Sequence, residues 1–184
     1  MLIVGLGNPG KDYEKTRHNI GFRVIDRLSE ILNTNVNTIK FKGLYGEGRH
    51  AGQKIQLLKP QTYMNLSGES VREVMDYFKL NPEEILVIVD DIDIDFSTLR
   101  IKPQGKAGTH NGLKSIIKCI DSQKFPRLRI GIGKKHPNQD LAKFVLSNFP
   151  KDEEQSIQDA IDTAAEAVLD IVEHGLDYSM NKYN

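Results

Sequence analysis

The segment Met1–Gly21 constrains the fold most, because three structural signals follow one another within it. Leu2–Val4 is a short apolar run without helix-initiating residues, as expected of a buried strand. The glycines and the proline of Gly5–Gly10 favour a tight turn. A helix is then predicted to begin near Asn19 or Ile20. A strand, a loop and a helix in this order are typical of an α/β protein, and such loops often carry functional side chains.

The glycines of this turn also match a dinucleotide-binding pattern. Gly5, Gly7 and Gly10 fit G-x-G-x-x-G after a strand, but the pattern indicates a nucleotide site only if a helix begins within the glycine run. Here a polar stretch delays the helix to Asn19. The acidic residue expected about twenty positions later has only Asp26 as a candidate, inside the predicted helix. A nucleotide-binding oxidoreductase domain stays an alternative, which a titration with NAD(P)H would test.

Size and composition favour one compact domain over residues 1–184. The chain has 184 residues and 39% of them are hydrophobic, enough for a full core. No stretch reaches the roughly 18 apolar residues of a membrane span, and no leader is expected before the strand at Leu2. The single cysteine, Cys119, excludes an internal disulfide. We therefore expect a cytoplasmic protein without a membrane segment.

The rest of the chain alternates between strand and helix patterns. The strongest strand is Ile85–Val89, a continuous apolar run typical of a central parallel strand. It ends in Asp90 and Asp91, and ligands of open α/β sheets bind outside such strand ends. The other predicted strands are 41–50, 54–59, 99–102 and 127–132, and the other helices follow Ser67 or span 113–120, 140–149 and 153–174. This order predicts an α/β fold with a mixed sheet covered on both faces.

Charge is balanced overall but divided along the chain. Lys and Arg total 25 and Asp and Glu total 25, which argues against a protein that coats nucleic acid generally. Between Arg100 and Lys135, however, the only acidic residue is Asp121, whereas the segment after Lys151 is mainly acidic. The basic segment could bind a polyanion or be one of two solvated faces. A non-catalytic RNA-binding module is therefore a second alternative.

Six polar residues in predicted loops or after strands are candidate site residues. Each could simply cap a helix or end a turn, but as a set they suit water activated by a base, with amides as binding groups. No serine nucleophile accompanies them. The five histidines lack close spacing and carboxylate partners, so we expect no metal site. The six residues are Asn8, His18, Asn65, Asp91, His110 and Asn111.

The chain resembles bacterial peptidyl-tRNA hydrolase in several segments that occur in the same order and at the same spacing. No single segment is specific, but jointly they cover most of the chain. They are VGLGNPG at 4–10, Tyr13, TRHNIGF at 16–22, KPQTYMNLSG at 59–68, Asp90-Asp91, GTHNGLKSI at 108–116 and LRIGIG at 128–133.

The resemblance implies hydrolysis of the ester that joins a peptide to the 3′ end of tRNA, which recycles tRNA from stalled translation. It implies that His18 is the catalytic base and that Asp91 orients it. Further roles follow in the same way. Asn8, Asn65 and Asn111 hold the substrate and the attacking water, His110 lines the cleft, Tyr13 and Met64 supply apolar contacts, and Lys102, Lys106, Arg127 and Arg129 contact tRNA phosphates.

The resemblance also implies a single three-layer α/β/α domain with a mixed twisted sheet, a monomer with no cofactor or metal. Two loop residues depart from the family pattern: Lys106 replaces a small residue and Thr109 replaces a glycine. Because neighbouring residues of a strand point to opposite sides, we expect Asp90 to face away from His18 and to matter less than Asp91.

Overall fold

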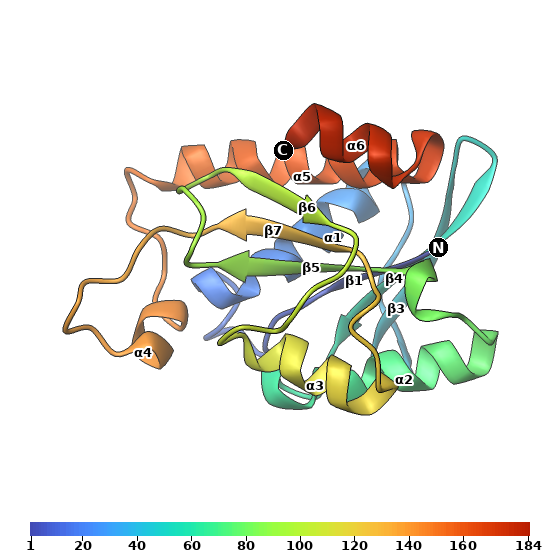
Figure 1. Cartoon of the computed structure of the whole chain (residues 1–184), viewed down its shortest axis with the longest axis horizontal. Helices are drawn as coiled ribbons and strands as arrows, with labels where there is room; N and C mark the ends of the chain where they lie inside the picture. The colour runs from blue at the N-terminus through green and yellow to red at the C-terminus, as the bar shows by residue number, and fades with distance from the viewer.

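A seven-stranded mixed sheet forms the centre of the molecule, in the order β2-β3-β4-β1-β5-β7-β6 (Figure 1). The computed structural model describes all residues, 1–184. Strands β4, β1, β5 and β7 run parallel, whereas β2, β3 and β6 lie antiparallel to their neighbours. The strands are β1 (Leu2–Gly5), β2 (Thr38–Lys40), β3 (Gly43–His50), β4 (Gln53–Pro60), β5 (Ile85–Asp91), β6 (Leu99–Lys102) and β7 (Arg127–Gly131).

Helices cover both faces of this sheet and give three layers. Figure 1 shows α5 and α6 along one side and α2 and α3 along the other. The α-helices are α1 (Ile20–Ile31), α2 (Ser67–Phe78), α3 (Asn111–Ile120), α4 (Leu141–Val145), α5 (Glu154–His174) and α6 (Leu176–Tyr183). Short 3-10 turns are η1 (Arg17–Asn19), η2 (Met64–Leu66) and η3 (Pro82–Glu84). The α/β class, the mixed sheet and the three layers predicted from the sequence are confirmed.

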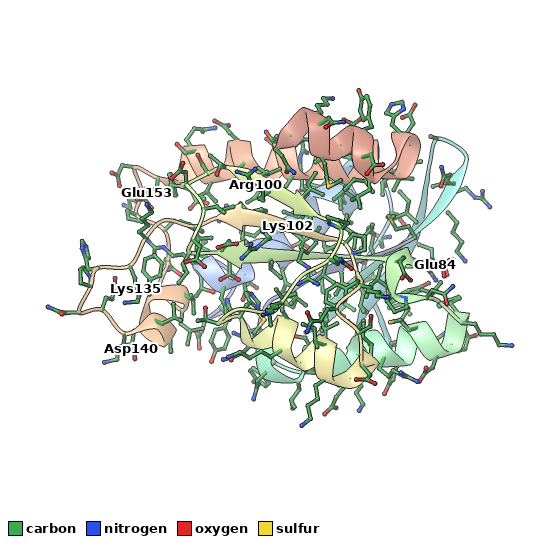
Figure 2. All side chains as sticks on the ribbon, in the orientation of Figure 1. Glu84, Arg100, Lys102, Lys135, Asp140 and Glu153 are labelled. Carbon is green, nitrogen blue, oxygen red and sulfur yellow. The ribbon has the colours of Figure 1, made fainter.

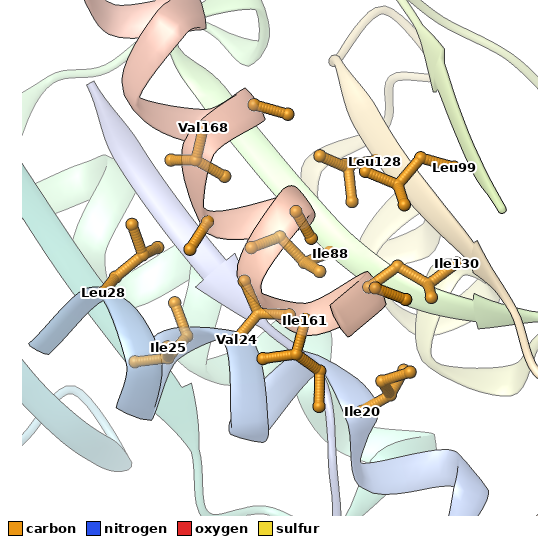
Figure 3. Close-up of a cluster of buried hydrophobic side chains, with 14 of the residues drawn as sticks. Ile20, Val24, Ile25, Leu28, Ile88, Leu99, Leu128, Ile130, Ile161 and Val168 are labelled. Atoms are coloured by element: carbon orange, nitrogen blue, oxygen red, sulfur yellow. The ribbon is translucent and has the colours of Figure 1, made fainter. Parts of the chain in front are cut away.

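Two hydrophobic clusters fill the spaces between the layers. One joins α1 and α5 to the sheet, with Val24, Ile161 and Ile88 among its fully buried members (Figure 3). The other joins α2 and α3 to the opposite face and includes Val87 and Val89. Successive residues of β5 therefore face opposite layers. The same alternation makes its two terminal aspartates, Asp90 and Asp91, point to opposite sides of the sheet.

Glycines let α1 lie directly against the sheet. A Cβ atom at Gly5 would lie 2.2 Å from the carbonyl oxygen of Gly21, and one at Gly21 would lie 2.4 Å from the backbone nitrogen of Leu6. Helix α1 starts at Ile20, well after Gly10. The glycines of the turn thus serve close packing of strand and helix, and the context required for a dinucleotide turn is missing.

The predicted elements agree with the structure except at the chain's short or exposed segments. Strand β2 and helix α6 were not predicted. Helix α4 ends at Val145 rather than 149. The N–H of Ser147 donates to the carbonyl oxygen of Phe144, only three residues back, and Asn148 then pairs in an extended bridge with Thr16. Pro150 also disfavours helix at Phe149. None of the helices combines the length and the apolar character needed to span a membrane.

Candidate active site

A cleft of about 620 Å³ opens at the carboxyl end of β5, where polar side chains from distant segments converge. Its floor comes from β5 and from the loop after β1. One wall is the segment 107–114, and another comes from α4. Of the residues predicted for the site, those that line the cleft are Asn8, His18, Met64, Asn65, Asp91, His110, Asn111 and Arg129.

A short hydrogen bond in the cleft joins His18 to Asp90. His18 lies in η1, just before α1, and its Nδ1 is 2.8 Å from Oδ1 of Asp90. Both side chains are nearly inaccessible, since 11% of His18 and 3% of Asp90 is exposed. The ring is therefore held in place by a carboxylate, as a base in a catalytic triad is held by its third member.

A second imidazole shares the same carboxylate oxygen. His110 Nε2 lies 3.0 Å from Asp90 Oδ1, and the backbone N–H of Leu113 donates to His110 Nδ1 at 3.3 Å. Because Nδ1 accepts, the proton of neutral His110 is on Nε2 and is donated to Asp90. An ionised carboxylate only accepts, so the neutral His18 ring donates from Nδ1. This leaves Nε2 of His18 as the nitrogen that can take a proton.

The electrostatics favour an ionised Asp90 and a more basic His18. Burial opposes the charge on Asp90, but the facing rings of His18 and His110 hold its pKa well below the ordinary value. Burial alone would lower the pKa of His18. The charge and hydrogen bond of Asp90 offset this effect, and the pKa of His18 is raised above its ordinary value.

Asp91, predicted to orient His18, lies on the other side of the strand. Its Oδ2 forms an ion pair with Nε of Arg129, and its Oδ1 accepts the backbone N–H of Asp93 at 2.7 Å. The prediction is wrong by one residue. Asp90 follows Leu86 and Ile88 on the face that α1 covers, and η1 leads into α1, whereas Asp91 shares the face of Val87 and Val89.

Asn8 is fixed by two hydrogen bonds to the side-chain amide of Asn19, which was not among the predicted site residues. The Asn19 side chain accepts from the backbone N–H of Asn8 at 2.8 Å and donates to its carbonyl oxygen at 2.9 Å. Oδ1 of Asn8 accepts the backbone N–H of Met64 at 2.8 Å. The Nδ2 group of Asn8 is thereby left to donate to a ligand. Asn19 is 1% exposed, and the only signal for its role was its place in the first loop.

The remaining predicted substrate contacts differ in their position relative to the cleft. Asn65 and Asn111 are exposed and line the cleft, whereas Met64 is buried in its wall. Tyr13 does not line the cleft. Its ring packs edge-on against that of Tyr63, with centroids 6.4 Å apart. The Tyr63 backbone has a φ of 60°, a strained conformation for a residue other than glycine.

Arg127, predicted to contact tRNA, is a buried brace instead. It is 1% exposed, and its guanidinium donates to the carbonyl oxygens of Gly105 at 2.7 Å and Lys106 at 3.2 Å. It also lies over the ring of Phe125. Burial and the nearby Arg129 lower its pKa to about 10. Strand β7 lies inside the sheet, so both of its faces are covered and its alternation does not separate core from solvent.

The other two predicted lysines, Lys102 and Lys106, are exposed and have no acidic partner within 4.0 Å. Lys106 borders a hollow of about 490 Å³ beside the cleft, together with Lys114 and Lys118. These side chains remain available to an anionic ligand.

The sequence predicted no metal site because the histidines are far apart in the chain and lack nearby carboxylates. That premise is wrong. His18, Asp90 and His110 bring three ligand atoms within 4.8 Å of one another. The hydrogen bonds nevertheless oppose coordination. A metal on Nε2 of neutral His110 needs the proton on Nδ1, where the N–H of Leu113 already donates. The arrangement suits proton transfer better than metal binding.

The fold and the cleft define an α/β protein whose histidine–aspartate pair is set for general-base chemistry. The chain matches the family described as peptidyl-tRNA hydrolase over residues 2–184 and belongs to that family. It is 52% identical to a peptidyl-tRNA hydrolase of Clostridium beijerinckii, with 100% of this chain and 95% of the relative covered. A relative from a Thermoanaerobacter species is 50% identical, with 100% and 98% covered.

The crystal structure of peptidyl-tRNA hydrolase from Acinetobacter baumannii has the same fold. It superposes on this chain with a TM-score of 0.94 at 39% sequence identity, covering 100% of this chain and 93% of that one. The family resemblance found in the sequence motifs is therefore confirmed.

Proposed function

We propose that this chain hydrolyses the ester between a peptide and the 3′ end of tRNA, with His18 activating the water. The observation that carries the catalytic assignment is the hydrogen bond of 2.8 Å from His18 to Asp90. Because an ionised Asp90 can only accept, neutral His18 donates from Nδ1 and its Nε2 carries no proton. Membership of the peptidyl-tRNA hydrolase family supports the choice of substrate.

In the proposed mechanism, Nε2 of His18 takes a proton from water as the water oxygen attacks the ester carbonyl carbon. The carbonyl electron pair moves to oxygen and gives a tetrahedral oxyanion. Asp90 stabilises the resulting imidazolium. The bond to the 3′ oxygen of tRNA then breaks, and the imidazolium returns the proton to that oxygen. Asp90 replaces Asp91 as the orienting carboxylate.

Amide groups supply the substrate contacts in this proposal. Asn8 offers Nδ2 from a fixed position, and Asn65 and Asn111 face the cleft from its rim. Such donors can bind the peptide main chain and the oxyanion without reading peptide side chains. Met64 provides apolar contact, while Tyr13 acts from outside the cleft through Tyr63.

The tRNA phosphates are proposed to lie along the basic residues beside the cleft. Lys102 and Lys106 have no acidic partner. Arg129 is already ion-paired with Asp91, so a phosphate would share this guanidinium with the Asp91 carboxylate. A largely electrostatic contact accepts many tRNA sequences. We further propose that the protein acts as a monomer in the cytoplasm, where translation takes place.

The test is hydrolysis of N-acetyl-aminoacyl-tRNA, followed by release of the acylated amino acid. The His18→Ala variant should lose about 10²–10⁴ in rate while its affinity for tRNA stays nearly unchanged. A wild-type protein that binds this tRNA without cleaving it would favour a non-catalytic RNA-binding module. A His18→Ala variant with more than about half of the wild-type rate would exclude His18 as the base.

A further inference from the structure

Arg17, the residue before His18, is buried and makes no contact with the catalytic pair. It is 8% exposed. Its Nη1 donates to Oγ of Ser147 at 2.6 Å and to the carbonyl oxygen of Asn148 at 2.7 Å, and its Nε donates to the carbonyl oxygen of Ile132 at 3.3 Å. Its guanidinium is also 3.7 Å from the carboxylate of Glu153.

Aromatic rings complete this enclosure. The guanidinium carbon lies 4.5 Å from the ring centroid of Phe144 and 5.1 Å from that of Phe149, distances at which a cation is attracted to a ring face. The backbone adds to the connection, since Arg17 donates to the carbonyl oxygen of Ser147 and Thr16 pairs with Asn148. The guanidinium is planar and has several N–H donors, so it can contact the hydrogen-bond acceptors and the two aromatic rings at the same time.

All partners of the Arg17 side chain belong to the segment from Ile132 to Glu153, which links β7 to α5. This segment projects at one end of the molecule, and Lys135 and Asp140 mark its outer part (Figure 2). Its helix α4 spans only Leu141–Val145, too short to be stable by itself. The apolar wall of the cleft nevertheless depends on it, through Leu141, Ala142, Val145 and Leu146.

We propose that Arg17 is a positioning residue that fixes this α4 wall relative to the segment carrying His18. Because this wall gives the cleft apolar surface that a bound substrate would cover, the proposal is that Arg17 sets substrate affinity, while His18 keeps its own hydrogen bond to Asp90. The predicted effect on substrate affinity rests on the proposed hydrolysis. The predicted role of Arg17 in holding the α4 wall in place does not.

The decisive experiment combines kinetics with hydrogen exchange in Arg17→Ala and in the matched control Arg23→Ala. Arg23 forms an ion pair with Glu154 at the start of α5 and does not touch the wall. Arg17→Ala should raise KM for N-acetyl-aminoacyl-tRNA at least about fivefold, leave kcat within about twofold, and leave the acid limb of the pH–rate profile in place. In Arg17→Ala, the backbone amide hydrogens of residues 141–148 should exchange faster than in the wild type, whereas those of α2 should exchange at the wild-type rate.

Arg17→Lys should recover only part of the affinity, because an ammonium lacks the fork that reaches several acceptors. If Arg17→Ala does not fold, Ser147→Ala tests the same contact and should change KM and local exchange in the same direction, less strongly. The proposal is overturned by a fall in kcat at constant KM, by unchanged exchange in 141–148, or by an equal effect of Arg23→Ala. If the wild type proves inactive, exchange alone decides the inference.

Discussion

At the scale of single residues, one carboxylate oxygen organises the proposed chemistry. Oδ1 of Asp90 accepts hydrogen bonds from both His18 and His110. The carboxylate therefore holds the His18 ring in place and also accepts the Nε2 proton of His110. Asp90→Asn keeps the shape, removes the charge, and can present an N–H where an acceptor is needed. We expect a loss in kcat of at least about tenfold, with the acid limb of the pH–rate profile shifted to lower pH.

Asp91→Asn is the matched control for this prediction. Asp91 pairs with Arg129 and does not contact His18, so this variant should keep kcat within about threefold of wild type. A freed Arg129 should tighten tRNA binding, which a titration with uncharged tRNA measures. The assignment of Asp90 fails if Asp91→Asn is the inactive enzyme and Asp90→Asn behaves like wild type.

The raised pKa of His18 makes a separate prediction for the wild type. The ring acts as a base only when it is neutral, so activity should fall as pH decreases through its pKa. The Asp90 carboxylate raises that pKa above its ordinary value despite the opposing effect of burial. The midpoint of the acid limb in kcat/KM should therefore lie above about 6.5. A midpoint below that value would contradict the assigned partner.

At the scale of elements, the contact between β1 and α1 depends on the absence of side chains. A Cβ at Gly21 would meet the backbone of Leu6 at 2.4 Å and that of Ile88 at 2.6 Å, and backbone cannot move aside cheaply. Gly21→Ala should cost about 3 kcal/mol in the free energy of unfolding by urea. The control is Gly48→Ala, whose nearest neighbour would be the Leu32 side chain at 3.4 Å. Equal losses in both variants would refute a specific close approach.

Two of the interior strands, β5 and β7, explain what the sequence could and could not predict. The apolar run of β5 identified a central strand and the position of the site at its end. Every residue of this strand is buried, however, so nothing in the pattern indicated which face belongs to α1 and which aspartate meets His18. The prediction that Arg127 faces solvent was wrong for the same reason. Arg127 alternates with Leu128 along β7, but both residues are buried.

The buried Arg127 makes a prediction about stability. Its guanidinium holds the loop before α3 through the carbonyl oxygens of Gly105 and Lys106. Arg127→Gln would leave several of these oxygens unpaired and should cost about 2–4 kcal/mol, measured by urea unfolding, without changing the salt dependence of tRNA binding. Lys106→Gln is the control on the same loop and should leave stability within about 0.5 kcal/mol.

At the scale of the whole molecule, the site exists because the chain brings distant segments to one edge of the sheet. Sequence motifs predicted the members of the cleft, including Asn8, His18 and His110, because each stands in a loop between regular elements. They could not predict that His18 and His110 share one oxygen, or that Asn19 braces Asn8. Those relations depend on the register of the strands and on the packing of α1 and α3 on opposite layers.

Charge separation is also a property of the whole molecule, and it gives the last prediction. The chain has no net charge, yet Lys102 and Lys106 stand exposed without acidic partners, so tRNA affinity should depend on a local basic surface. Charge reversal of either lysine should raise KM and reduce the slope of log affinity against log salt by about one per lost phosphate contact, with kcat less affected. The control is Lys79→Glu, at the end of α2 remote from η2 and the cleft. Slopes that change equally in all three variants would mean that net charge, rather than this surface, governs binding.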